Sequence, residues 1–276
     1  MENNSEFLEK NGYLILENFV SEDNLNKIKK GFEEHTKYIR DLGLEGISGP
    51  EKNIANEKIL NYCPGILDIV NNKSLNHLLE KYLGKNFKIL NIYPTISKPI
   101  KADANDQRNF NKDESLCCYH HDQIGKQLKL IIVLHDIDEN QNCLEYAVQS
   151  HKVGILDQYI IKFFNFFGFF KNWDKSIINH FFLKILGRNP AFLKEKTISK
   201  KFKIKQVYAK SGAVFMFDTN GYHRQKPANE FTDFNILRKT IFLDCAPEKQ
   251  LARSKIRMKF ETINKDLYQK MGNYFR

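Results

Sequence analysis

Four polar residues stand beside strand-like runs and limit what this chain can fold into. His120 and Asp122 are two residues apart in the middle of the chain. Much later, His223 follows an apolar run, and Arg238 lies inside residues 236–243. Runs rich in β-branched and aromatic residues are typical of strands. The pattern therefore favours a β-rich core whose strands bring these distant residues together.

The residue types at these positions indicate a metal site. Two imidazoles and one carboxylate hold a non-haem Fe(II) and leave three coordination positions open, which gives room for a bidentate co-substrate and O2. In an extended segment, residues i and i+2 face the same side, so His120 and Asp122 can reach one ion while His121 points away. His223 would supply the third ligand from another part of the fold.

Arg238 sits in a strand-like run, where a guanidinium needs an anionic partner. Its planar fork pairs bidentately with carboxylates, and the distal carboxylate of 2-oxoglutarate would serve. Thr240 would share the face of Arg238 in a regular strand and would be a second contact to that carboxylate. The alternative is an ion pair between Arg238 and a nearby aspartate, such as Asp244 or Asp136.

A single His-x-Asp pair is weak evidence, because such pairs usually form surface turns or satisfied hydrogen bonds. Here four blocks occur in order along the chain, and they are residues 7–21, 119–122, 131–152 and 212–239. The second block reads Tyr-His-His-Asp, and the third contains Ser150-His151-Lys152. Taken together, the blocks resemble the phytanoyl-CoA dioxygenase family of Fe(II)/2-oxoglutarate oxygenases over residues 5–245.

The resemblance implies a fold and a set of site residues. The fold would be a mostly β core with flanking helices (α+β), a double-stranded β-helix of the jelly-roll, cupin-like kind, with N-terminal helices and a helical insertion. The cofactor would be Fe(II), with 2-oxoglutarate and O2 as co-substrates. The iron ligands, which are also the catalytic residues, would be His120, Asp122 and His223. The residues that would bind 2-oxoglutarate are Arg238, Thr240, Gln225 and Ile131.

Length agrees with a single oxygenase domain over residues 1–276, since a barrel with additions commonly reaches this size. The expected parts of this domain are a barrel core at 85–154 and 206–246, a helical insertion at 155–205 and a C-terminal helical segment at 247–276.

Several local elements are also expected. One helix begins at Ser21, and another begins near Ser74 and ends at Gly84, each with an apolar stripe. Residues 87–93 predict a strand that leads toward the site. The polar residues 98–114 form either a mobile loop that closes over the pocket or a simple solvated connection.

The expected insertion at 155–205 contains a dense aromatic run, which includes Phe163, Phe164, Phe166 and Phe167. Three interpretations compete: an aromatic helical face packed against the core, a lid or wall for a hydrophobic substrate, and docking on a membrane surface together with nearby lysines. Packing against the core is the favoured one. Polar and charged residues interrupt the run, so it is not expected to span a bilayer.

Two aspartates narrow the chemistry that the resemblance implies. Related halogenating enzymes have no carboxylate at the position of Asp122, so that chloride can bind the iron. Related nucleic-acid repair enzymes carry a second arginine six residues after the co-substrate arginine, where this chain has Asp244. Oxygen insertion or desaturation is therefore favoured over halogenation, and no nucleic-acid substrate is expected.

The net charge and the cysteine content limit which binding partners and which cellular compartment we expect. The net charge of +10 would attract phosphate-bearing substrates or nucleic acid, or it simply reflects a lysine-rich composition, which we favour. The five irregularly spaced cysteines fit reduced thiols, and the first six residues lack the pattern of a signal peptide. No transmembrane segment is expected, and the predicted location is cytoplasmic.

These observations lead to one expected function and two alternatives. The chain is expected to be an Fe(II)/2-oxoglutarate-dependent dioxygenase that hydroxylates a C–H bond with release of succinate and CO2. Its partner would be a small-molecule or carrier- or CoA-linked substrate, either anionic or hydrophobic. The first alternative is a non-catalytic double-stranded β-helix protein that binds a ligand or partner. The second is the same fold with another metal that performs hydrolysis.

Overall fold

The computed structural model describes residues 2–44, 58–101, 117–122, 126–139, 143–152, 195–230 and 232–248. Its helices are α1 (Glu2–Asn11), α2 (Glu22–Asp41), α4 (Ile59–Tyr62), α5 (Gly65–Val70), α6 (Lys73–Leu83), the 3-10 turn η2 (Ser150–Lys152) and α9 (Glu195–Lys201). Its strands are β1 (Tyr13–Leu16), β2 (Phe87–Ser97), β3 (Leu128–Val133), β4 (Leu144–Ala147), β5 (Ile204–Val207), β6 (Val214–Asp218), β7 (His223–Gln225) and β8 (Arg238–Pro247).

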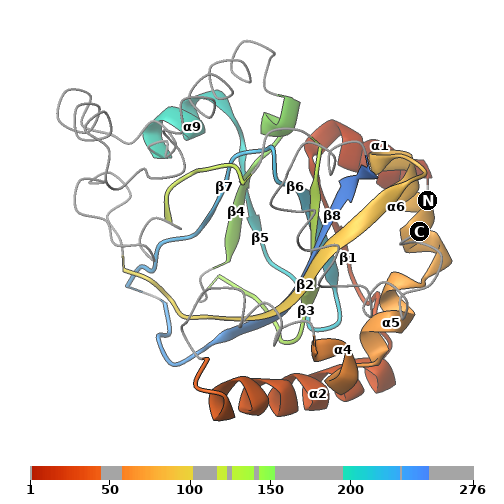
Figure 1. Cartoon of the computed structure of the whole chain (residues 1–276). Coiled ribbons are helices and arrows are strands. Elements are labelled where there is room, and N and C mark those ends of the chain that lie inside the picture. The colour runs from red at the N-terminus through yellow and green to blue at the C-terminus, as the bar shows by residue number, and fades with distance from the viewer. Residues whose placement is uncertain are drawn as a thin grey trace, which may run out of the picture.

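The strands form two antiparallel sheets. The larger sheet has the order β1-β6-β3-β8-β2, and the smaller has the order β5-β4-β7. Figure 1 shows the smaller sheet on one side of the larger one and the helices α2, α4, α5 and α6 on the other side. Two facing antiparallel sheets with covering helices form a double-stranded β-helix, so the predicted fold class is confirmed.

Alternate residues of the central strands face opposite sides of the larger sheet. In β3, Leu130 and Ile132 belong to the core that the helices cover, whereas Ile131 and Val133 belong to the core between the two sheets. The strands β6 and β8 divide their apolar residues in the same way. Because the side-chain period of a strand is two, the polar residues in the second row also point between the sheets.

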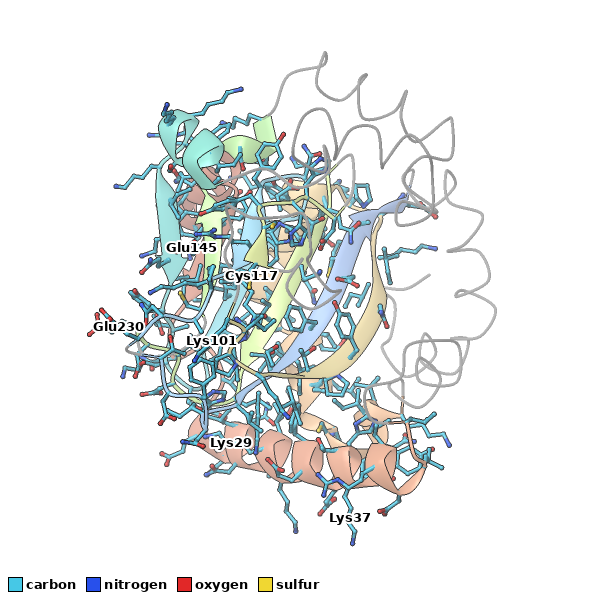
Figure 2. The ribbon with its side chains drawn as sticks, turned by 90° about the vertical axis from the view of Figure 1, so that its left-hand side faces the viewer. Lys29, Lys37, Lys101, Cys117, Glu145 and Glu230 are labelled. Atoms are coloured by element: carbon cyan, nitrogen blue, oxygen red, sulfur yellow. The ribbon has the colours of Figure 1, made fainter. Side chains whose placement is uncertain are left out.

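Helix α2 covers the outer face of the larger sheet with the apolar stripe expected from the sequence. Leu25, Ile28 and Phe32 are buried along this stripe. On the opposite face, Lys37 points away from the sheet in Figure 2. The expected cap, Ser21, lies at the N-cap position in an extended conformation, but its side chain makes no capping hydrogen bond.

Helix α6 begins at Lys73, one residue before the expected start, because the residue ahead of it provides the cap. The Asn72 side-chain oxygen accepts hydrogen bonds from the backbone N–H groups of Ser74 (3.0 Å) and Leu75 (3.1 Å). Asparagine is among the best capping residues for this reason. The helix ends at Gly84, whose φ of +101° is readily adopted only by glycine, as predicted.

Strand β2 extends beyond the predicted residues 87–93, because it pairs with β8 as far as Ser97. This pairing places Ser97 opposite Arg238, at the first residue of β8. Strand β5 begins at Ile204, inside the segment expected to be a helical insertion.

Parts of several predictions fall on residues 102–116, 153–194 and 249–276, which lie outside the described residues. These parts are the loop at 98–114, the aromatic run and the C-terminal segment. The division of the domain into core, insertion and C-terminal segment stays a prediction.

Two further sequence expectations can be compared with the described residues. The cysteines are all free and buried, as expected for reduced thiols, and they are Cys63, Cys117, Cys118, Cys143 and Cys245. Within the described part of the chain, no helix has the length and apolar composition needed to cross a bilayer.

Phe32→Ala is expected to lower the free energy of unfolding by about 3–5 kcal/mol, because the phenyl ring is completely buried in the core that the helices share with the larger sheet. Chemical denaturation would measure this loss. Lys30→Ala, at an exposed position of the same helix, is the control and should change stability by less than about 0.5 kcal/mol. Equal effects of the two substitutions would contradict the packing of α2.

Candidate metal centre

A short antiparallel bridge brings two of the expected ligands together. The backbone N–H of His120 donates to the His223 carbonyl (3.0 Å), and the N–H of His223 donates to the His120 carbonyl (2.8 Å). The imidazole rings lie side by side as a result, with centroids 4.7 Å apart. Two residues from distant parts of the chain thus lie side by side at the edge of the smaller sheet.

Asp122 completes the set from the same short segment as His120. Its backbone N–H donates to the Thr219 carbonyl (3.1 Å), which places it beside the turn that precedes β7. Its Oδ1 lies 3.6 Å from His120 Nε2 and 3.4 Å from His223 Nε2. All three ligand atoms lie within 4.8 Å of one another, and no other such group occurs among the described residues.

The hydrogen bonds of the two imidazoles orient the same nitrogen of each ring toward Asp122. His120 Nδ1 lies 2.7 Å from the Cys118 carbonyl, and His223 Nδ1 lies 2.9 Å from the Gly221 carbonyl. Because a carbonyl oxygen can only accept, each Nδ1 carries a proton, and Nε2 is the nitrogen of each ring that points at Asp122. Burial, helped by the neighbouring His223, lowers the pKa of His120 to about 4, so this ring is neutral at pH 7.

Asp122 is ionised and faces the open side of the site. Although burial alone would raise its pKa, the nearby His223 and Lys129 hold the pKa of Asp122 well below its usual value. Its side chain stays 27% exposed, whereas that of His223 is 6% exposed. His121 contacts Tyr222 edge-on, with ring centroids 5.5 Å apart. The donor set is therefore two imidazoles and one carboxylate, which fits a divalent iron.

A buried ion pair lies directly behind the two histidines. The Glu145 carboxylate accepts hydrogen bonds from Arg224 Nε (2.7 Å), from the Tyr119 hydroxyl (3.1 Å) and from the Gln206 amide (3.0 Å). The Arg224 guanidinium lies over the Tyr119 ring, 4.4 Å from its centroid. Tyr119 and Arg224 are the chain neighbours of His120 and His223, so this cluster fixes both backbone segments from the rear.

Glu145 and Cys117, both labelled in Figure 2, lie close together, since Arg224 donates hydrogen bonds to the carboxylate of Glu145 and to the carbonyl of Cys117. The second contact runs from Arg224 Nη1 to the Cys117 carbonyl at 3.5 Å. Sequence reasoning missed this cluster. Its only signal was that a tyrosine and an arginine directly adjoin the expected ligands.

The turn before β7 is tied down by the Ser-His motif of η2. The Ser150 hydroxyl accepts a hydrogen bond from the Tyr222 backbone N–H (2.7 Å), and the Asn220 amide donates to the His151 carbonyl (2.8 Å). A Cβ atom on Gly221 would lie only 2.0 Å from the Tyr146 hydroxyl, so the turn has no room for a side chain there. These contacts aim His223 at the other two ligands.

Asp218 supports the start of the same turn. The Tyr82 hydroxyl donates to Asp218 Oδ2 (2.6 Å), and the Asn220 N–H donates to Asp218 Oδ1 (2.8 Å). Burial raises the pKa of Asp218 to about 6, against the lowering effect of these hydrogen bonds.

A cavity lies between the two sheets, and its lining residue Phe215 stacks on Phe217, which packs against His223. It is lined by Ile131, Val133, Ile137, Leu144, Val207, Ala209, Phe215, Arg238, Thr240 and Phe242. The lining is apolar except at Arg238 and Thr240, which lie two residues apart on the inner face of β8, as expected for a regular strand. Ile131 also lies where it was expected. Such a cavity suits a small molecule with one acidic end.

Arg238 is buried (8% exposed) and donates to the Ser97 hydroxyl at 3.3 Å. Burial lowers its pKa to about 10, so the guanidinium is still charged at pH 7. Neither aspartate considered from the sequence fits as its ion-pair partner. Asp136 binds Lys210 (2.8 Å), and Asp244 lies six residues further along the same strand, about 20 Å away at the rise of a β-strand.

Thr240 and Gln225 were also expected to bind 2-oxoglutarate, and they lie differently relative to the cavity. The Thr240 hydroxyl is buried and has no hydrogen-bond partner among the described residues, so a polar group faces the cavity beside Arg238. Gln225 is not among the described residues that line the cavity. Its side-chain amide donates to the Lys98 carbonyl at 3.0 Å, because β7 turns this residue toward the end of β2.

Comparison with known proteins identifies the group to which the site belongs. Residues 8–227 match the family described as phytanoyl-CoA dioxygenase (PhyH). None of the curated proteins matches the sequence significantly.

Several solved structures share the fold at low sequence identity. AviO1 from Streptomyces viridochromogenes Tue57 is 16% identical with a TM-score of 0.54, and the match covers 90% of this chain and 95% of that one. EctD from S. alaskensis, solved with bound Fe, is 15% identical with a TM-score of 0.54 and coverages of 90% and 76%. The non-heme alpha ketoglutarate dependent carbocyclase SnoK from nogalamycin biosynthesis is 11% identical with a TM-score of 0.54 and coverages of 90% and 84%.

Asp218→Asn is expected to change how stability depends on pH. The folded-state pKa of Asp218 is raised, from an ordinary 3.8 to about 6, so the folded protein takes up this proton before the unfolded chain does. The wild type should therefore gain stability from this group as pH falls from above 6 to about 4, and the variant should lack that gain. Denaturant unfolding at several pH values measures it. Parallel pH profiles for the two proteins would contradict the assignment.

Proposed function

Because the chain belongs to the phytanoyl-CoA dioxygenase family, we propose that it is an Fe(II)- and 2-oxoglutarate-dependent oxygenase that hydroxylates a C–H bond of a small-molecule or carrier- or CoA-linked substrate. One observation carries the proposal. Two imidazole Nε2 atoms and one carboxylate oxygen converge, and a cavity between the same two sheets has a buried arginine and a threonine on an otherwise apolar wall.

His120, Asp122 and His223 would hold the iron through Nε2, Oδ1 and Nε2. Their hydrogen bonds support this role, because the Nδ1 of each imidazole donates to a backbone carbonyl and the carboxylate is ionised. A three-ligand set of this composition leaves positions open for a co-substrate and O2. A hydrolytic metal site of the same fold, the alternative with another metal, would give no succinate.

Arg238 and Thr240 would bind the distal carboxylate of 2-oxoglutarate. The planar guanidinium of Arg238 lines the cavity, and a carboxylate accepts from such a group through charge-assisted hydrogen bonds. Ile131, Phe215 and Phe242 line the same cavity and would contact the methylene groups between the two acidic ends. The acid at the other end would then point toward the iron ligands.

With iron and 2-oxoglutarate bound, the site would supply an O2-derived oxidant that removes hydrogen from a C–H bond, with release of succinate and CO2. The protein's own contribution is to place the substrate and to keep water and other C–H bonds away from this oxidant. The rings of Phe215 and Phe217 stack 5.4 Å apart, and Phe217 packs against His223 at 4.8 Å. These apolar rings exclude water on the side of the site that faces the cavity.

Hydroxylation is proposed over other outcomes of the same chemistry because Asp122 occupies the position that halogenating relatives leave without a carboxylate. The similar fold of SnoK, described as a carbocyclase, supports ring closure as the second outcome to test. Succinate release with a panel of candidate substrates, followed by mass spectrometry, distinguishes a gain of one oxygen from a loss of two hydrogens.

His223→Ala is expected to abolish Fe(II) binding in an anaerobic titration, since a buried ligand is lost and no other described group can replace it. His121→Ala is the matched control, because this neighbouring imidazole contacts Tyr222 and lies outside the ligand set. Wild-type iron affinity in His223→Ala would overturn the ligand assignment. A wild-type protein that binds no Fe(II) and consumes no 2-oxoglutarate would instead support the non-catalytic alternative.

Arg238→Ala is expected to weaken 2-oxoglutarate binding about 10- to 100-fold while Fe(II) affinity is retained, because hydrogen bonds to charged groups contribute about 1.5–3 kcal/mol. Thr240→Val removes one neutral hydroxyl at nearly constant volume and should weaken binding only about fivefold. Equilibrium titration of the iron-loaded protein with 2-oxoglutarate measures both. Unchanged affinity in Arg238→Ala would place the co-substrate elsewhere.

A further inference from the structure

Lys129 is a charged side chain between the two sheets that neither the ligand set nor the cavity lining includes. It lies on β3, where its neighbours Leu128 and Leu130 point to the opposite side, into the core beneath the helices. The side-chain period of two therefore turns Lys129 toward the metal centre. Its ammonium lies 2.6 Å from Asp122 Oδ2, and only 16% of the side chain is exposed.

The two oxygens of Asp122 have different surroundings. Oδ1 faces both imidazoles, at 3.6 Å and 3.4 Å from their Nε2 atoms, whereas Oδ2 accepts from Lys129. A free carboxylate can bind a metal through one or both oxygens. Here the ammonium occupies the second oxygen, so only Oδ1 is left for an ion that the histidines also bind.

Groups on two other strands hold the ammonium in place. In the sheet register, Lys129 lies directly opposite Asp244 of β8. The Phe242 ring lies 5.7 Å from the ammonium and stacks on Tyr93 of β2, with ring centroids 5.3 Å apart. A carboxylate and an aromatic face favour a cation at this position. Lys129 is thus fixed from β2 and β8 while it binds Asp122.

We propose that Lys129 is a positioning residue of the metal centre, whose ammonium keeps Asp122 a one-oxygen ligand and so keeps a coordination position open for 2-oxoglutarate. The inference rests on the proposed function. If Asp122 bound iron through both oxygens, it would occupy one of the positions that the co-substrate needs. Outer partners of metal ligands commonly change affinity or activity by 10- to 100-fold.

The test compares three substitutions in the full-length protein. Lys129→Met removes the ammonium at similar length, Lys129→Arg keeps a cation, and Lys129→Gln keeps an N–H donor without the charge. Lys126→Met is the matched control, because Lys126 is a nearby lysine whose ammonium binds Glu9 at 3.0 Å and not Asp122. For each protein, Fe(II) affinity is measured anaerobically, and 2-oxoglutarate is then titrated into the iron complex by its charge-transfer absorption.

The expected result is a split between the two affinities. Lys129→Met should bind Fe(II) as tightly as the wild type or more tightly, because Asp122 gains a second contact to the metal. Its affinity for 2-oxoglutarate should fall by about 10- to 100-fold, with an altered charge-transfer band. Lys129→Arg should recover most of this loss, Lys129→Gln should recover less, and Lys126→Met should match the wild type.

Two results would overturn the role of Lys129. One is unchanged binding of both Fe(II) and 2-oxoglutarate in Lys129→Met. The other is a parallel loss of both affinities that Lys129→Arg does not restore, which is the pattern of a merely structural residue. Failure of the wild type itself to bind Fe(II) is a distinct result, and it would overturn the proposed function together with this inference.

Discussion

The reciprocal backbone hydrogen bonds between His120 and His223 are the constraint on which the site depends. They join two segments that are far apart in the chain, and they fix the distance between the imidazoles. The buried Glu145–Arg224 pair stabilises this bridge from behind. Removing one member of a buried ion pair typically costs about 3–5 kcal/mol, because the other charge is left without compensation. Stability of the core and geometry of the ligands are therefore coupled here.

The alternation of side chains across the larger sheet connects this bridge to the rest of the molecule. One face of β3, β6 and β8 is mostly apolar and belongs to the core that the helices cover. The other face of β3 presents Lys129, Ile131 and Val133 in a row. At one end of this row Lys129 binds Asp122, and at the other end Ile131 and Val133 line the cavity together with Arg238. The candidate ligand set and the cavity thus lie along one inner surface.

The ligand set and the arginine could be predicted from local rules. A spacing of two residues puts His120 and Asp122 on one side, and the same rule pairs Arg238 with Thr240. The fold class followed from strand-like runs and a family resemblance. The role of Gln225 stays a prediction, because its amide donates to the Lys98 carbonyl and the direction of a three-residue strand depends on what it packs against. Lys129 gave no signal, since a lysine in a strand is usually exposed, and its neighbours Asp122 and Asp244 come from a separate segment and from the opposing strand.

By itself, the sequence determined which chemical groups are available and which side of each strand they occupy, because these follow from residue type and from the two-residue period. The tertiary structure alone decided which groups meet. The Glu145–Arg224–Tyr119 cluster, the Ser150 contact to the turn at Gly221 and the division of the Asp122 oxygens all join residues from separate strands or turns. Such contacts arise only when sheet register and packing are set, because hydrogen bonds act over about 3 Å and local sequence carries no information on that scale.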